Sequence, residues 1–94
     1  MSNPVTVTNP DGREIVLTTR AWRHVLDEHA EMEGHRGAIL ATIERPDFIE
    51  PDERDGRERY FRRGFGPARW LRVVVAFEHE PARVVTAFGQ DEEP

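Results

Sequence analysis

Three strand-like segments separated by short turns fill the second half of the chain, and they constrain its fold more than any other feature. Their bounds are Arg57–Arg63, Leu71–Phe77 and Val84–Phe88. Every second residue of the middle segment is apolar and shares one face, which is the period of a strand with a buried side. The turns at residues 64–67 and 78–81 contain glycine or proline and are too short for the crossover that parallel strands require. The segments therefore predict an antiparallel meander.

The first half of the chain begins with a predicted β-hairpin. Strand-like residues from Val5 to Thr18 flank the segment Asn9-Pro10-Asp11-Gly12, in which proline, aspartate and glycine each favour a tight turn. Thr18 or Thr19 can then cap a helix, for which Gly34 is the expected stop.

A second helix is expected from about Arg36 to Arg45, because the residue before Pro46 disfavours helical dihedrals. Phe48 and Ile49 then indicate a short buried or edge segment. Together the elements predict an α+β fold: an N-terminal hairpin, two helices, and a mainly antiparallel sheet of three to four strands with the helices on one face.

The length of 94 residues predicts a single domain spanning 1–94. We expect the hairpin within residues 1–18, the core within 18–89, and a disordered acidic tail at 90–94. No apolar run approaches the roughly 20 residues of a membrane-spanning helix, and Met1–Thr8 lacks the parts of a signal peptide. We therefore expect a cytoplasmic protein with no membrane partner. The absence of cysteine agrees with this and removes disulfides and thiolate chemistry.

Charge is distributed unevenly along the chain. The net charge is −5, yet residues 54–72 contain seven arginines against Asp55 and Glu58. Guanidinium groups that alternate with aromatic rings are typical of surfaces that bind single-stranded RNA. The same pattern also suits the polar side of an edge strand, where charge discourages aggregation. The residues that would bind a substrate are Tyr60, Arg59, Arg63, Arg72 and Trp70.

The segment Trp22–His29 contains two histidines five positions apart. On an ideal helix this spacing puts them on different faces, so they are poorly placed to bind one metal ion together. We therefore expect no metal site. His29 shares the apolar stripe of the first helix and is either a buried histidine bonded to a carbonyl or an acid–base group facing the sheet. His24 points the other way and suits a solvated surface position. Thr86 is either a β-favouring filler or a hydroxyl donor at the end of the sheet.

Several motifs follow one another in a specific order. They are Trp22-x-His24-Val25-x-x-x-His29-x-Glu31, a helix ending at Pro46-Asp47, Tyr60-x-Arg62, Leu71-Arg72-Val73-Val74-Val75 and Val85-Thr86-Ala87-Phe88. In this order and spacing, from about Thr18 to Phe88, they resemble the phage-associated branch of the barnase, EndoU, colicin and RelE-like (BECR fold) nuclease superfamily. The resemblance implies a small α+β domain with two helices before a four-stranded antiparallel sheet, and a ribonuclease of toxin or effector type that needs no metal or other cofactor.

The resemblance also implies roles for particular residues. It puts His24, His29, Tyr60, Arg62 and Thr86 near one face of the domain. A 2′-hydroxyl of RNA would attack the adjacent phosphate, a histidine would transfer the proton, and Arg62 and Thr86 would stabilise the phosphate oxygens. Of the two histidines, His29 is favoured because it faces the sheet.

Three functions stay open, in this order of preference. The first is an RNA-cleaving enzyme with RNA as partner. The second is a non-catalytic module on the same scaffold that binds a protein or an anion, for example as a homodimer through the strand that contains Tyr60 and Phe61. The third is an antitoxin or immunity-type protein, which the small size and acidity favour. An antitoxin or a fused domain is a further partner in the first case.

Overall fold

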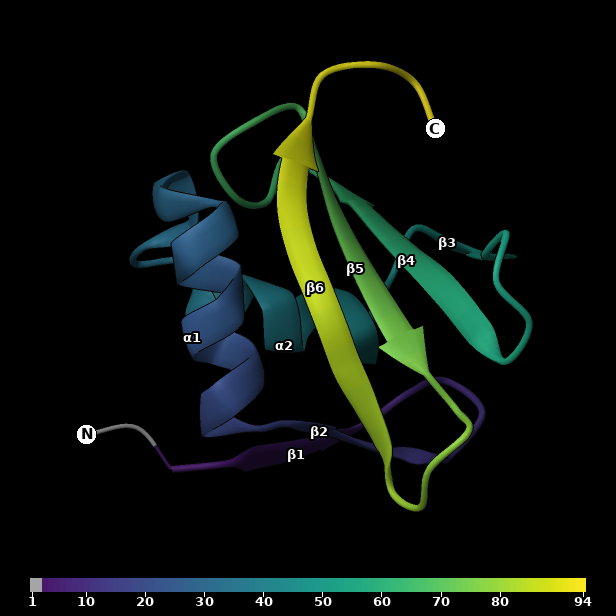
Figure 1. The fold of residues 1–94 in the computed structure, drawn as a ribbon. Coiled ribbons are helices and arrows are strands. Elements are labelled where there is room, and N and C mark those ends of the chain that lie inside the picture. Colours follow the sequence, from purple (N-terminus) through teal and green to yellow (C-terminus); the bar gives the residue numbers. More distant parts are fainter. Residues whose placement is uncertain (1–2) are drawn as a thin grey trace.

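The computed structural model of the chain describes residues 3–94, which form a sheet covered by helices (Figure 1). The sheet contains six strands. The strands are β1 Val5–Thr8, β2 Glu14–Leu17, β3 Phe48–Pro51, β4 Arg57–Arg63, β5 Trp70–Ala76 and β6 Ala82–Gln90. The helices are α1 Thr19–Glu28, the 3-10 turn η1 Ala30–Met32, and α2 Arg36–Glu44. Within residues 3–94, no helix combines the length and the apolar character needed to cross a membrane.

The strand order is β1-β2-β6-β5-β4-β3. The meander of β4, β5 and β6 is antiparallel, as predicted. The N-terminal hairpin joins it through a short parallel pair in which Ile15 lies opposite Ala82 and Val16 opposite Arg83. The α+β class, the hairpin and the two helices are thereby confirmed. The sheet is larger than the expected three to four strands, because the hairpin and β3 both hydrogen-bond to the meander.

The core lies between the sheet and the helices. On β5, Leu71, Val73 and Val75 face the helices and are fully buried. The helices contribute the buried side chains Val25, Met32, Ile39 and Ile43. In Figure 1, α2 lies behind the strands and α1 lies alongside β6, so the opposite side of the sheet carries no helix. We call this helix-free side the open face.

A β-bulge in β6 changes which side chains reach the open face. Val75 pairs with Val84 whereas Val74 pairs with Thr86, so Val85 is an extra residue in β6. Strict alternation predicts that Val84 and Thr86 share a face. The bulge separates them instead, leaving Val84 in the core and turning Thr86 to the open face.

The first helix ends earlier than the expected stop at Gly34. Thr18 caps its N-terminus by accepting a hydrogen bond of 3.0 Å from the Ala21 N–H. The α-helix then ends at Glu28, and His29 is the C-cap with φ −139° and ψ 74°. The chain continues through η1 to Gly34, whose φ of 84° favours glycine. The ideal-helix angle between His24 and His29 therefore does not apply, because His29 has left the helix.

Asn9 connects the hairpin turn to strand β4. Its Oδ1 accepts hydrogen bonds from the N–H groups of Asp11 (3.0 Å) and Arg13 (2.9 Å). Its Nδ2 donates to the hydroxyl of Tyr60 at 2.9 Å, and the residue is 4% exposed. One buried side chain therefore stabilises the turn and attaches it to β4.

We expect Asn9→Ala to destabilise the protein by about 2–3 kcal/mol, because it removes three hydrogen bonds and leaves turn N–H groups without a partner. Urea unfolding followed by circular dichroism measures the change. The matched control is Asp11→Asn in the same turn, which is exposed and should stay within about 0.5 kcal/mol of wild type. Equal stability of the two variants would contradict the tethering role of Asn9.

Candidate functional site

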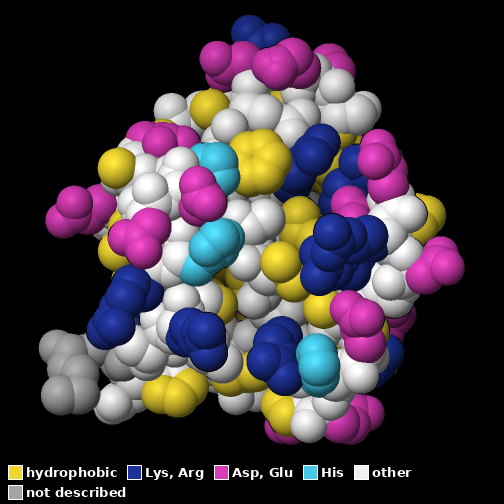
Figure 2. Space-filling view, in the orientation of Figure 1, with side chains coloured by type: hydrophobic (Ala, Val, Ile, Leu, Met, Phe, Trp, Pro, Cys, Tyr) yellow, Lys and Arg dark blue, Asp and Glu magenta, His cyan; other side chains and the backbone are white. Residues whose placement is uncertain are grey.

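A row of side chains crosses four strands on the open face. Phe48 of β3 lies opposite Phe61 of β4, Phe61 lies opposite Arg72 of β5, and Arg72 lies opposite Phe88 of β6. We call these four residues the cross-strand row. In the view of Figure 1, Figure 2 shows arginine, histidine and hydrophobic side chains adjoining on this face. Ring stacking and guanidinium–ring contacts connect the residues of the row.

Arg72 is the cation at the centre of the row. Its guanidinium carbon lies 5.2 Å from the ring centroid of Phe61 and 5.3 Å from that of Phe88. Its Nε is buried without a hydrogen-bond partner, and no carboxylate among residues 3–94 forms an ion pair with it. Burial lowers the pKa of Arg72 below its usual range, the neighbouring charge of Arg59 acts in the same direction, and the carboxylates of Glu50, Asp52 and Glu53 oppose both. A guanidinium stays protonated at neutral pH, so the row contains a cation that forms no direct ion pair within residues 3–94.

His29 extends the row beyond Phe88. Its ring stacks on the Phe88 ring with centroids 4.9 Å apart and an angle of 27° between the planes. Its Nδ1 lies 3.7 Å from Oε2 of Glu31, and its side chain is 30% exposed. The end of α1 therefore brings an accessible imidazole and a carboxylate to the edge of the open face.

Thr86 lies on the open face because of the bulge, two residues before Phe88 on β6. Its side chain is half-buried. The structure thus brings His29, Thr86 and Arg72 to the same side of the sheet.

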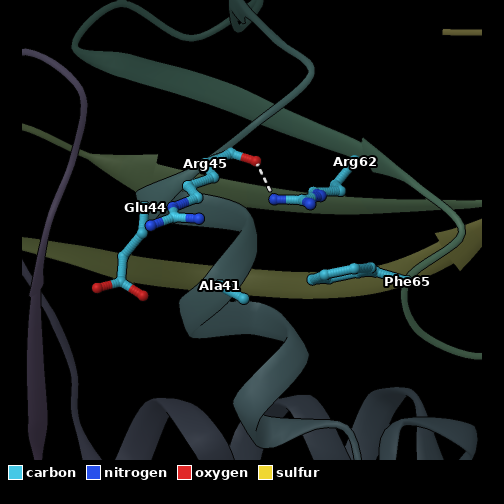
Figure 3. Close-up of a pocket in the computed structure, with 5 residues that line it drawn as sticks. All are labelled: Ala41, Glu44, Arg45, Arg62 and Phe65. Carbon is cyan, nitrogen blue, oxygen red and sulfur yellow. Dashed lines mark hydrogen bonds between the residues drawn. The ribbon is translucent and has the colours of Figure 1, made fainter.

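Arg62 lies on the other side. It pairs with Leu71, which faces the helices, and its Nη1 donates a hydrogen bond of 2.6 Å to the carbonyl of Arg45 at the end of α2. Its guanidinium also stacks over Phe65 at 4.3 Å. These groups line a pocket of about 290 Å³ together with Ala41 and Glu44 (Figure 3). Arg62 therefore provides a hydrogen-bond donor for a carbonyl at the C-terminus of α2. It does not lie on the same face as His29 and Thr86.

The other expected substrate-binding residues separate into two groups. Tyr60 is fully buried on the helix side, where its hydroxyl contacts Asn9 and donates to Glu58 at 3.2 Å, so it offers no surface to a ligand. Arg59 is on the open face but already binds Glu50 (3.2 Å), Asp52 (3.6 Å) and the carbonyl of Pro51. It holds β3 against β4.

Arg63 and Trp70 remain next to the cross-strand row. Arg63 is exposed, and its guanidinium lies 5.9 Å from the ring of Trp70. Trp70 is 7% exposed and meets Phe48 edge to face at 5.6 Å. Arg63 therefore adds a second cation to the border of the row.

His24 is exposed on α1. Among residues 3–94, no three histidine, cysteine or carboxylate side chains gather in a way that could hold a metal ion. Phe48 and Phe88 are functional candidates to which the sequence motifs gave no role in the site. The signal that could have found them is cross-strand register, which a single sequence does not reveal because turn lengths alone leave it open.

The titration of Tyr60, the only tyrosine of the chain, tests its placement in the core. Burial raises the pKa of its phenol from 10.0 to about 12, and Glu58 acts in the same direction while the Asn9 hydrogen bond opposes it. Ultraviolet absorbance should therefore detect tyrosinate near pH 12 in the folded protein but near 10 in denaturant. Because the unfolded chain loses this proton first, stability should fall as the pH rises from 10 towards 12. A folded-state pKa near 10 would mean that solvent, and hence a ligand, reaches the hydroxyl.

Comparisons with known proteins identify no relative of this chain. No protein-family model, curated protein or solved structure matches the chain. The candidate site is therefore defined by the residues of the open face and their contacts.

Proposed function

We propose that the open face binds single-stranded RNA and cleaves it without a metal ion, with Arg72 and His29 as the central residues. One observation carries this proposal: both side chains contact the same ring. His29 stacks on Phe88 at 4.9 Å, and the Arg72 guanidinium lies 5.3 Å from the centroid of that ring. A cation and an imidazole that contact the same ring supply the two groups that cleavage through a 2′-hydroxyl requires.

Arg72 binds the phosphate in this proposal. Its planar fork donates two parallel hydrogen bonds to phosphate oxygens, and the rings of Phe61 and Phe88 fix the plane of the fork. An incoming phosphate also gives the guanidinium the anionic partner that residues 3–94 do not provide. Thr86, on the same face, is the hydroxyl that can donate a further hydrogen bond to the phosphate.

His29 transfers the proton. With Nδ1 turned towards Glu31 at 3.7 Å, Nε2 is the ring nitrogen left to accept the proton of the 2′-hydroxyl. The 2′-oxygen then forms a bond to phosphorus while the bond from phosphorus to the 5′-oxygen breaks. The 5′-oxygen takes a proton from water, and the imidazolium returns its own proton to the solvent. The products are a 2′,3′-cyclic phosphate and a free 5′-hydroxyl, and Glu31 stabilises the charged imidazole between these steps.

The resemblance to the BECR fold nucleases supports the same chemistry with a different arginine. Tyr60-x-Arg62 suggested Arg62 for the phosphate, but that side chain binds the end of α2 on the helix side of the sheet. Arg72 belongs to the Leu71–Val75 motif of the same resemblance and shares a face with His29 and Thr86. We therefore assign the phosphate to Arg72.

Substitution of the two arginines separates these assignments. Arg72→Gln should lower RNA cleavage at least tenfold, because it removes the charge-assisted hydrogen bonds to the phosphate. Arg62→Gln should leave cleavage within about threefold at a temperature where the variant is folded, because its bonds are structural. The measurement is the rate at which labelled single-stranded RNA yields cyclic-phosphate ends in the presence of a chelator, with folding checked by circular dichroism.

Arg23→Gln on α1 is the matched control for charge, because Arg23 is exposed. His29→Gln should likewise lower cleavage at least tenfold, because it removes the group that transfers the proton. Loss of cleavage in Arg62→Gln together with full activity in Arg72→Gln would contradict the assignment. Binding of RNA by wild type with no cleavage would instead favour the non-catalytic module, in which the same face holds an anion.

A further inference from the structure

The cross-strand row ends at Phe48, on the side away from His29. Phe48 is 37% exposed and is the only exposed large hydrophobic side chain in residues 3–94. Phe61 stacks on it with centroids 5.0 Å apart and 26° between the planes, and Trp70 meets it edge to face. These contacts hold the ring in place on the folded protein, so it offers a fixed aromatic surface to solvent.

The charges around Phe48 favour a polyanion with aromatic groups over an apolar partner. Arg72 lies two strands away in the same row, and Arg63 lies over Trp70. Neither forms an ion pair with a carboxylate of residues 3–94. Of the acidic side chains close to Phe48 in the chain, Glu50 is bound to Arg59 at 3.2 Å and Asp47 accepts a hydrogen bond of 2.7 Å from the backbone N–H of Arg63. An exposed ring on the same face as guanidinium groups that form no ion pair is a combination that binds a base and a neighbouring phosphate.

The length of the row matches a short piece of single-stranded nucleic acid. Phe48 and Phe88 are three strand-to-strand steps apart, or roughly 14 Å at ~4.8 Å per step. About two to four nucleotides cover this distance, depending on how far the strand is extended. A phosphate at Arg72 then has a neighbouring base within reach of Phe48.

We propose that Phe48 forms a base-stacking subsite, and that the RNA lies across the strands along the row with one phosphate at Arg72 and an adjacent base on Phe48. The subsite rests on the proposed function, since it takes the phosphate position from Arg72. It selects single-stranded RNA, because the faces of a base within a duplex are covered by its neighbours. It also requires at least two nucleotides, because a single nucleotide cannot occupy both positions.

Binding to an uncleavable five-nucleotide RNA with 2′-O-methyl groups tests the subsite, measured by fluorescence anisotropy of a labelled strand. Phe48→Leu should weaken binding about tenfold, because it keeps apolar contact with Phe61 but removes the stacking ring. Phe48→Trp should bind at least as well as wild type. The matched control is Phe65→Leu, which changes a half-buried ring on the helix side of the sheet and should bind like wild type. The same five nucleotides annealed to their complement should bind at least tenfold more weakly than the single strand.

A series of RNAs that each lack one base identifies the contact. In wild type, loss of the base that stacks on Phe48 should weaken binding about tenfold, and in Phe48→Leu the same loss should cost nothing further. Wild-type affinity in Phe48→Leu, or an unchanged cost of the missing base in that variant, would overturn the subsite. If Arg72→Gln weakens binding in the same assay, such a result leaves the proposed function intact. Failure of wild type to bind the RNA at all would contradict the proposed function, and the subsite with it.

Discussion

Strand β5 lies between β4 and β6, and each of its side chains must face either the helices or the open side of the sheet. Leu71, Val73 and Val75 face the helices and build the core, and Arg72 and Val74 face the other way. The core and the candidate site are therefore two sides of one strand. A shift of its register by one residue would bury Arg72 among hydrocarbon and expose Val73, which burial energetics forbid. The hydrophobic contacts of the core thus fix the position of the guanidinium, although they never touch it.

The elements whose signals are local could be predicted from the sequence. The meander follows from alternation and short turns, the hairpin from Asn9–Gly12, and the end of α2 from Pro46. The parallel contact between β2 and β6 could not be predicted, because it joins segments far apart in the chain and only two residue pairs form it. A homodimer through the strand that contains Tyr60 and Phe61 would need a free edge on β4, which also depends on non-local pairing. Both edges of β4 are already paired, with β3 and β5.

The candidate site shows the same division between local and non-local information. The sequence indicates His29, Thr86 and Arg72 as candidates, yet their spacing in the chain does not predict which arginine lies on the same face as the other two. Two local irregularities decide this. The helix ends at Glu28, which frees His29 to stack on Phe88, and the bulge at Val85 turns Thr86 away from the core. Neither leaves a distinct mark in the sequence, because a bulge residue and a helix end can be almost any residue type.

The parts of the site come from positions 29 to 88 of the chain and from β3, β4, β5, β6 and the end of α1. No single hairpin or helix contains both His29 and Arg72, and the ring that joins them belongs to the strand nearest the C-terminus. During synthesis the imidazole and the guanidinium are therefore made before the ring that joins them. Both contact this ring only when β6 docks between β2 and β5. The site consequently forms only when folding is complete. A partly unfolded chain contains the same side chains, but they do not make the contacts that define the site.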